Sequence, residues 1–279
     1  MSNSAHTMNW DVTWHAGHVS SKHDPAPEIQ SHPLTDDLIV MRQNMSVHYE
    51  APFMFLLIGA ERALLIDTGA TAREKYLPLR RTVDEHLKSR GPDFPLLVVH
   101  THGHLDHVHG DAQFTDRPNT VVVDRDLESV CRFYGFDDWP ATTRSVDLGD
   151  RVVDVIPGPG HQSAATVFYD RRTGVLFTGD SIYPGRLYVQ DWAAYTATID
   201  RLVEWAQEHP VSYVVGCHIE KNSRGELYPI GTTYQPDEPP LQLPVSALTD
   251  LRDGLATVNG DEGMFDFGAF EIFHPETAA

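Results

Sequence analysis

The chain has 279 residues, of which 41% are hydrophobic and 22% charged, so it is long enough for one sizeable core and has the composition of a globular protein. Its 21 basic and 40 acidic residues give a net charge of −19, and such a surface repels the phosphate backbone of nucleic acids. No apolar run approaches the ~20 residues that span a bilayer, no signal-peptide pattern opens the chain, and two cysteines cannot form a disulfide framework. We therefore expect a cytoplasmic protein that binds neither nucleic acid nor membrane.

The first half of the chain predicts an arm followed by alternating strands and helices. Residues 1–35 are polar and rich in His, Ser and Pro, which is typical of a poorly ordered arm or of one draped over a domain. Apolar runs bounded by turn residues then predict strands, and spaced apolar residues predict helices. In chain order these are a strand hairpin at 53–59 and 63–69, a helix at 70–90 with Pro78 as a break, strands at 95–100 and 120–126, and a short helix through Cys131.

The second half continues the same alternation. The predicted elements are strands at 152–161, 165–170, 174–180 and 211–218, helices at 192–209 and 246–255, and a terminal strand pair at 264–273. A loop rich in Pro and Gly occupies 219–243. Because the composition does not change before this loop, we expect a single α/β domain over 36–279.

The stretch HTHGHLDHVHG, residues 100–110, places five histidines and an aspartate directly after a predicted strand. Gly103 permits a turn, so that His102 and His104, two residues apart, can grip one metal ion from an extended segment. Asp106 and His107 come from the next turn and can face a second ion. The alternative is a surface cluster that binds metal adventitiously.

Three further candidate ligands stand alone at the ends of predicted strands. His161 follows PGPG, Asp180 ends GVLFTGD, and His218 ends VSYVVGCH. In an α/β sheet, groups at the ends of neighbouring strands converge on a crevice, which is where small-molecule sites form. This convergence favours a built metal site over a surface cluster.

Five motifs together make the chain resemble the metallo-β-lactamase fold superfamily. They occur in the family's order and are LLIDTG (64–69), THGHLDH (101–107), PGPGHQSA (157–164), FTGDSIY (177–183) and GCH (216–218). The resemblance implies an αββα sandwich with the site at one edge between the two sheets. It also implies that His102, His104 and His161 bind a first metal ion. Asp106, His107 and His218 would then bind a second, Asp180 would bridge both, and Asp67 would orient the site from behind the ligands.

The ligand types and the details of the motifs narrow the expected chemistry. Imidazole and carboxylate suit Zn²⁺, and a pair of ions ~3.5–4 Å apart can hold a hydroxide at neutral pH and polarise a carbonyl oxygen. Asp180 stands where dedicated β-lactamases of classes B1 and B2 carry Cys, and His104 stands where flavodiiron proteins carry Glu. Glyoxalase II and the acyl-homoserine lactonases keep the bridging Asp. His100 and His109 flank the motif without matching it and are expected not to be ligands.

The leading hypothesis is a hydrolase with two zinc ions per chain that cleaves a small ester-like, thioester or lactone substrate through a metal-bridging hydroxide. Asp106 would orient the hydroxide and pass on its proton, and Tyr183 would hydrogen-bond the substrate oxygen, unless it is only a packed aromatic residue. The alternatives are a mononuclear iron redox enzyme resembling the persulfide dioxygenases and a metal-stabilised binding protein without turnover.

The loop at 219–243 follows the last candidate ligand and is expected on the substrate side of the site. Its tyrosines could form an apolar wall, and its basic residues could meet an anionic substrate group. The residues concerned are Lys221, Arg224, Tyr228 and Tyr234, with His48 and Tyr49 reaching the same mouth. The alternative for the two tyrosines is packing under the loop, and the alternative for the two basic residues is solvation of their charges.

Overall fold

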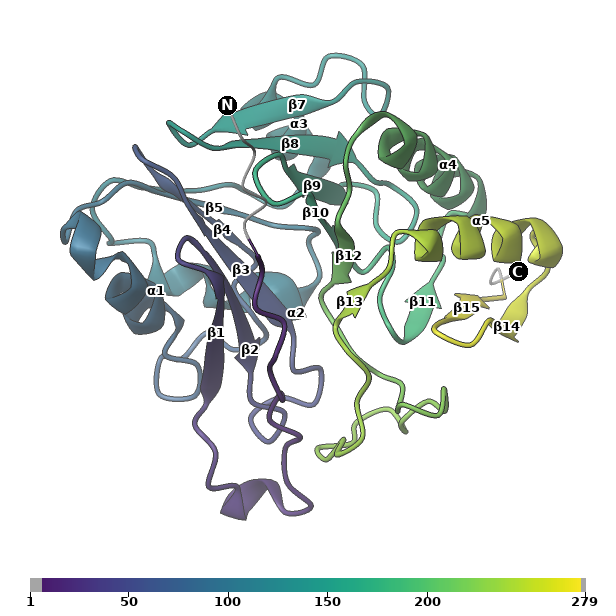
Figure 1. Cartoon of the computed structure of the whole chain (residues 1–279), viewed down its shortest axis with the longest axis horizontal. Helices are drawn as coiled ribbons and strands as arrows, with labels where there is room; N and C mark the ends of the chain where they lie inside the picture. Colours follow the sequence, from purple (N-terminus) through teal and green to yellow (C-terminus); the bar gives the residue numbers. More distant parts are fainter. Residues whose placement is uncertain (1–6, 277–279) are drawn as a thin grey trace.

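The structure, a computed structural model, describes residues 7–276 and consists of two facing six-stranded sheets with helices on their outer sides (Figure 1). The first sheet has strand order β1-β2-β3-β4-β5-β6. Its strands are β1 (Ile29–Thr35), β2 (Leu38–Gln43), β3 (Phe53–Ile58), β4 (Ala63–Ile66), β5 (Leu96–Val99) and β6 (Thr120–Val122). The pairs β4–β5 and β5–β6 are parallel, and the others are antiparallel.

The second sheet has strand order β13-β12-β10-β9-β8-β7, in which only β10 and β12 run parallel. Its strands are β7 (Arg144–Asp147), β8 (Val152–Pro157), β9 (Thr166–Asp170), β10 (Val175–Gly179), β12 (Tyr213–Gly216) and β13 (Gln242–Leu243). A small third sheet joins β11 (Arg186–Tyr188), β15 (Glu271–His274) and β14 (Gly263–Asp266).

The helices lie mainly on the outer faces of the two sheets (Figure 1). They are α1 (Leu79–Leu87), α2 (Leu105–Val108), α3 (Leu127–Tyr134), α4 (Trp192–Glu208) and α5 (Ser246–Val258). Short 3₁₀ turns are η1 (Ser21–His23), η2 (Lys88–Arg90) and η3 (His109–Gln113). The helix predicted over 70–90 begins only at Leu79, because the proline at 78 favours a helix start and disfavours a helix interior.

Alternation along each strand builds the layers. On β3, Phe53, Phe55 and Leu57 face the second sheet and join a cluster with side chains of β8, β9, β10 and β12. Met54 and Leu56 point the other way and pack under α1. The second sheet buries its opposite set of side chains under α4 and α5. The αββα sandwich and the single domain expected from the sequence are therefore confirmed.

Residues 1–6 of the predicted arm lie outside the described range. Residues 7–35 lie against the domain. Trp14 is buried and packs edge-on against Phe53, with ring centroids 4.9 Å apart. Gly17 pairs with Tyr234 in a β-bridge, so the arm touches the loop at 219–243. The last seven residues of the arm form strand β1, which pairs with β2.

Within residues 7–276, no helix has both the length and the apolar character that crossing a membrane would require.

Candidate metal centre

The candidate ligands gather at one edge of the sandwich because strands of both sheets end there. They are the segment 100–107 after β5, His161 after β8, Asp180 after β10 and His218 after β12. Gly179 lets the two sheets meet at this edge. It has a φ of 54°, and a Cβ at this position would lie only 2.6 Å from the Cβ of Thr101. A larger residue would therefore push Asp180 away from the β5 side of the site.

Three imidazoles form the first cluster, in which one nitrogen from each ring lies within 4.8 Å of the others. His104 Nδ1 is 2.9 Å from His102 Nε2 and 3.1 Å from His161 Nε2. The other nitrogen of His161 donates to the carbonyl oxygen of Tyr188 at 2.9 Å, which leaves its Nε2 free to accept a metal ion. The three rings therefore offer converging nitrogen atoms, as a metal ion requires.

Two imidazoles and a carboxylate form the second cluster, together with Asp180. Asp106 Oδ2 lies 3.1 Å from His107 Nε2 and 3.3 Å from His218 Nε2, and the two Nε2 atoms are 3.3 Å apart. His218 Nδ1 donates to the carbonyl oxygen of Glu50 at 3.0 Å, so this ring too turns its Nε2 inward. The cluster has the mixed nitrogen and oxygen ligands that suit zinc.

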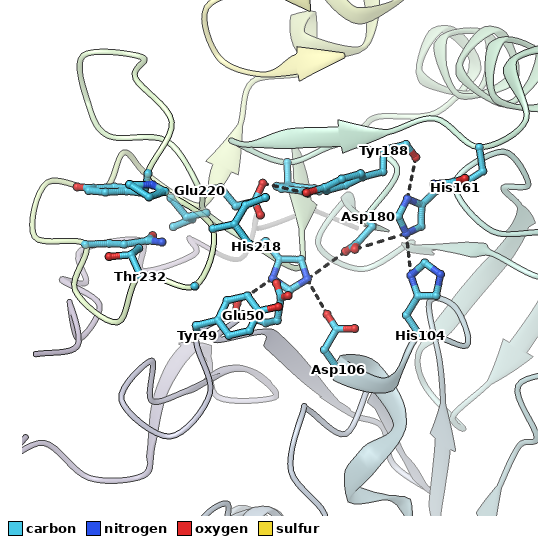
Figure 2. A pocket seen from close by; sticks show the side chains of 18 residues that line it. Tyr49, Glu50, His104, Asp106, His161, Asp180, Tyr188, His218, Glu220 and Thr232 are labelled. Atoms are coloured by element: carbon cyan, nitrogen blue, oxygen red, sulfur yellow. Dashed lines mark hydrogen bonds and ion pairs between the residues drawn. The ribbon is translucent and has the colours of Figure 1, made fainter. Parts of the chain in front are cut away.

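Asp180 stands between the two clusters and offers one oxygen to each (Figure 2). Its Oδ1 is 3.5 Å from His107 Nε2 and 3.4 Å from His218 Nε2. Its Oδ2 is 3.8 Å from His102 Nε2 and 3.6 Å from His161 Nε2. Among the described residues, the buried Oδ1 has no hydrogen-bond partner. A buried carboxylate oxygen without a partner is costly, and a cation in each cluster would remove that cost, so the donor set fits a metal pair.

The carboxylates raise the pKa values of two neighbouring histidines and so favour positive charge in the second cluster. Burial alone would lower the pKa of His218, but Asp180 and Asp106 outweigh burial and raise this pKa to about 10. The pKa of His107 is likewise raised against burial, by Asp106, Asp180 and Asp67. Burial would raise the pKa of Asp180, but the neighbouring His218, His107 and His102 hold it below its usual range. Protons on His107 and His218 therefore supply, in the second cluster, positive charge that a metal ion would otherwise provide.

Asp67 lies behind the ligands and fixes the orientation of His107. It is fully buried, has a φ of 65°, and follows β4. Its Oδ1 accepts from the Thr101 backbone N–H at 2.7 Å, and its Oδ2 accepts from the Thr101 hydroxyl at 2.8 Å and from His107 Nδ1 at 2.9 Å. The Cys217 thiol also donates to Oδ2, at 3.3 Å. Asp67 thereby keeps the hydrogen of His107 on Nδ1 and turns its Nε2 toward the second cluster.

A pocket of about 250 Å³ opens over both clusters (Figure 2). Side chains of both clusters form its floor, and the loop at 219–243 forms one wall, with the segment 228–232 and Gln235. Tyr49, Glu50, Tyr188 and Gln190 line the remaining sides. The mouth therefore combines aromatic rings with acidic and amide groups, and part of the loop at 219–243 borders it.

Tyr183 lines the pocket, and its ring packs against His218 with centroids 5.5 Å apart. Its hydroxyl donates to the Arg186 carbonyl oxygen and lies 3.3 Å from Glu220 Oε2. Burial raises the pKa of Tyr183, so the phenol keeps its proton. Bonding to a substrate would require this hydroxyl to leave the Arg186 carbonyl.

Of the loop residues that the sequence suggested, Tyr228 lines the pocket, whereas Tyr234 and Arg224 do not. Tyr234 pairs with the arm, and Arg224 is exposed and bound to Glu226 at 2.9 Å. Lys221 is buried and donates to Asp266 at 2.7 Å.

Three histidines near the site lie outside both clusters. His48 stacks on Tyr49 with ring centroids 5.1 Å apart and is not among the pocket-lining residues. His109 Nδ1 donates to the Ala70 carbonyl oxygen at 3.1 Å. His100 is buried with one ring nitrogen 3.3 Å from Asp111, and its ring makes no hydrogen bond with any described residue.

Two acidic residues of the pocket, Glu50 and Glu220, were not predicted from the sequence. Glu220 stands two positions after His218, and that proximity was the one signal in the sequence that could have indicated it. Glu50 precedes the first predicted hairpin, lines the pocket, and accepts from His218 Nδ1 at its carbonyl oxygen. Burial raises the pKa of Glu220, against the opposing effect of the Arg186 backbone N–H.

Comparison with known proteins agrees with the geometry. Residues 50–258 match the family model described as the metallo-beta-lactamase superfamily. Acyl-coenzyme A thioesterase MBLAC2 from Homo sapiens is 28% identical over 221 residues, covering 65% of this chain and 77% of that protein. A hydroxyacylglutathione hydrolase from Chelativorans sp. (strain BNC1) is 28% identical over 167 residues, covering 58% and 63% respectively.

Among solved structures, a metallo-beta-lactamase from Pontibacter korlensis shares the fold, with a TM-score of 0.54 and 18% identity. The match covers 82% of this chain and 99% of that one.

Proposed function

The chain belongs to the metallo-beta-lactamase superfamily and is a metal-dependent hydrolase, and we propose that it uses two zinc ions to cleave a small thioester, ester or lactone. The observation that carries this proposal is the position of Asp180, which points one oxygen toward each cluster, with Oδ1 making no hydrogen bond to any described residue. A single ion would contact one oxygen of this carboxylate and leave the cluster at the other oxygen without a metal ion.

The proposed ligands divide between the two ions as the clusters do. His102, His104 and His161 hold one ion, Asp106, His107 and His218 hold the other, and Asp180 reaches both. Such a pair, when bound, supplies Lewis acidity toward a carbonyl group and lowers the pKa of coordinated water toward neutrality.

Asp106 is the residue proposed to accept a proton during hydrolysis. Burial would raise its pKa, but His107 and His218 hold it well below the usual range, so the carboxylate is ionised at neutral pH. It lines the pocket floor, where a nucleophile derived from water would stand. Tyr183 is also proposed to donate to the substrate oxygen, which requires its hydroxyl to give up its hydrogen bond to the Arg186 carbonyl oxygen.

A thioester is the first substrate to test, because both named enzymes among the relatives act on compounds of this class. Acyl-coenzyme A is named for one relative, and hydroxyacylglutathione for the other. The pocket of about 250 Å³ admits an acyl group of a few carbons but not a whole coenzyme, whose remainder would lie outside the mouth.

The experiment compares zinc-loaded protein with protein stripped by chelator, using a thioester, an oxygen ester and a lactone of equal acyl length. We expect hydrolysis of at least one of the three only in the zinc-loaded sample, with circular dichroism confirming that the stripped protein is folded. Zinc-loaded protein that stays folded and hydrolyses none of them would contradict the proposal. A protein that unfolds without metal and never turns over substrate would instead be a metal-stabilised binding protein.

A further inference from the structure

Apart from the histidines of the clusters, the pocket over the metal clusters is lined by acidic side chains and by no Lys or Arg. None of its eighteen lining residues is Lys or Arg, whereas Glu50 and Glu220 stand beside the cluster aspartates. Metal ions in the clusters would offset the charge of the ligands, but Glu50 and Glu220 belong to neither cluster. Their charge is therefore available to whatever part of a substrate extends beyond the reacting carbonyl.

Glu220 has one oxygen engaged and one free. Its Oε2 accepts from the Arg186 backbone N–H at 2.8 Å and lies 3.3 Å from the Tyr183 hydroxyl. Its Oε1 accepts no hydrogen bond from any residue that the structure describes. In Figure 2 the Glu220 carboxylate lies near the ring of His218, on the side of the pocket away from His104. A carboxylate oxygen without a hydrogen-bond partner, on a half-buried residue that lines the pocket, is a ready acceptor for a ligand.

The nearby cations are held by other groups. Arg186 donates from Nη1 to the Tyr188 hydroxyl at 3.2 Å, and its guanidinium lies over the Tyr188 ring rather than in the pocket lining. Lys221 donates to Asp266 and to the Gly268 carbonyl oxygen. Neither supplies the positive charge that a carboxylate-bearing acyl group would need.

We propose that Glu220 is a specificity-determining residue, assisted by Glu50, which selects acyl groups that carry a hydrogen-bond donor. An ammonium or hydroxyl group a few carbons from the carbonyl would donate to Glu220 Oε1, and a terminal carboxylate would be repelled. The inference rests on the proposed function, because it assigns the acyl group of the substrate to this pocket. It also sets this chain apart from an enzyme whose pocket recognises an anionic acyl group.

The first experiment measures kcat/KM of the zinc-loaded enzyme for four thioesters of one neutral thiol. Their acyl chains have equal length and end in amino, hydroxyl, methyl or carboxylate groups. We expect the amino or hydroxyl substrate to exceed the carboxylate substrate at least about tenfold, the worth of one hydrogen bond to a charged group. The amino and hydroxyl arms show which donor is preferred. Equal or better turnover of the carboxylate substrate would overturn the proposal.

The matched variants are Glu220→Gln and Glu226→Gln. Glutamine at 220 can still accept from the Arg186 N–H, so the local structure is kept while the charge is lost. Glu226 lies on the same loop, is exposed and stands outside the pocket lining, so its variant removes the same charge elsewhere. We expect the amino-to-carboxylate ratio to fall at least about tenfold in Glu220→Gln and to stay unchanged in Glu226→Gln. An unchanged ratio in Glu220→Gln would overturn the proposal.

A binding measurement separates this inference from the proposed hydrolysis. Alkyl thiols with amino, methyl or carboxylate ends share the group that binds zinc and differ only at the far end. Calorimetry on zinc-loaded wild-type protein, with spacers of two to five carbons, is expected to find higher affinity for the amino thiol than for the carboxylate thiol. In Glu220→Gln we expect this difference in affinity to disappear. If the protein binds the amino thiol more tightly but hydrolyses no thioester, the proposed function is refuted while the proposed role of Glu220 in specificity stands. The reverse order would refute the specificity even if hydrolysis is found.

Discussion

Asp67→Asn tests whether a buried carboxylate behind the ligands sets the affinity of the second cluster. The substitution keeps the size of the side chain, and asparagine tolerates the positive φ of 65° at this position. The amide oxygen can replace Oδ1 as acceptor for the Thr101 N–H. The amide nitrogen would then stand where Oδ2 now accepts from His107 Nδ1 at 2.9 Å. Two donors would face each other across that contact.

His107 can respond in two ways, and both weaken metal binding. It can keep its hydrogen on Nδ1 and leave it unpaired, at a cost of about 1–3 kcal/mol for a buried donor. It can instead move the hydrogen to Nε2, the nitrogen that faces Asp106 and His218, where it blocks a metal ion. The first cost corresponds to roughly 5- to 150-fold in affinity, which agrees with the roughly 10- to 100-fold effect of losing a hydrogen-bond partner behind a metal ligand.

The assay is competition for zinc between the protein and a chromophoric chelator. We expect the weaker of two binding steps to lose about 10- to 100-fold in affinity in Asp67→Asn. The control is Asp111→Asn, which removes the same charge near the site from a residue that accepts from Thr68 at 2.8 Å and belongs to neither cluster. Folded Asp67→Asn protein with zinc affinity within about threefold of wild type would refute this account of His107, and so would an equal loss in the control.

Three further outcomes are expected. Asp180→Asn should keep the fold but lose one bound ion and at least roughly 100-fold in turnover, because an amide bridges two cations poorly. Unchanged turnover with one ion per chain, measured by metal analysis, would show that one ion suffices. In the metal-free protein His218 has a pKa of about 10 against a usual value of 6.5, so its ion pairs stabilise the fold fully below about pH 6.5 and cease to do so as pH rises through 10. Zinc must displace that proton, so calorimetry in two buffers near pH 8 should detect proton release, and affinity should rise with pH toward 10; binding without proton release would contradict the raised pKa. Glu238→Ala should lower the free energy of unfolding, measured with denaturant, by about 3–5 kcal/mol. Arg42 is only 2% exposed and donates to both Glu238 oxygens, so the substitution leaves it as an unpaired buried charge. A loss under about 1 kcal/mol would contradict this.

Local patterns predicted the α/β alternation and the gathering of the candidate ligands, whereas the two-sheet sandwich was implied by the resemblance to the metallo-β-lactamase superfamily. Alternating and continuous apolar runs identify strands such as β3 and β10, and the ends of such strands must lie at one edge of their sheet. His161, Asp180 and His218 stand within a few residues of the end of a strand, and the segment 102–107 follows β5. The prediction of where they converge therefore needed no knowledge of distant contacts.

Contacts between distant segments could not be predicted in the same way. The bridge between Gly17 and Tyr234 and the ion pair between Arg42 and Glu238 join segments about two hundred residues apart, and no local pattern indicates such partners. Which loop side chains face the pocket could not be decided from the sequence for the same reason. For Arg224 the sequence left open contact with an anionic substrate or solvation, and the structure has it exposed and paired with Glu226. The short strands β7 and β11 carry few apolar residues and were not predicted.

The most direct test of the proposed binuclear centre is the metal content and metal positions of the zinc-loaded protein. Elemental analysis should find two zinc ions per chain, and anomalous diffraction should place them on either side of Asp180, about 3.5–4 Å apart. One set of ligands should be His102, His104 and His161, and the other Asp106, His107 and His218. A single iron per chain in active protein, or a second ion outside contact with Asp180, would contradict the binuclear zinc centre.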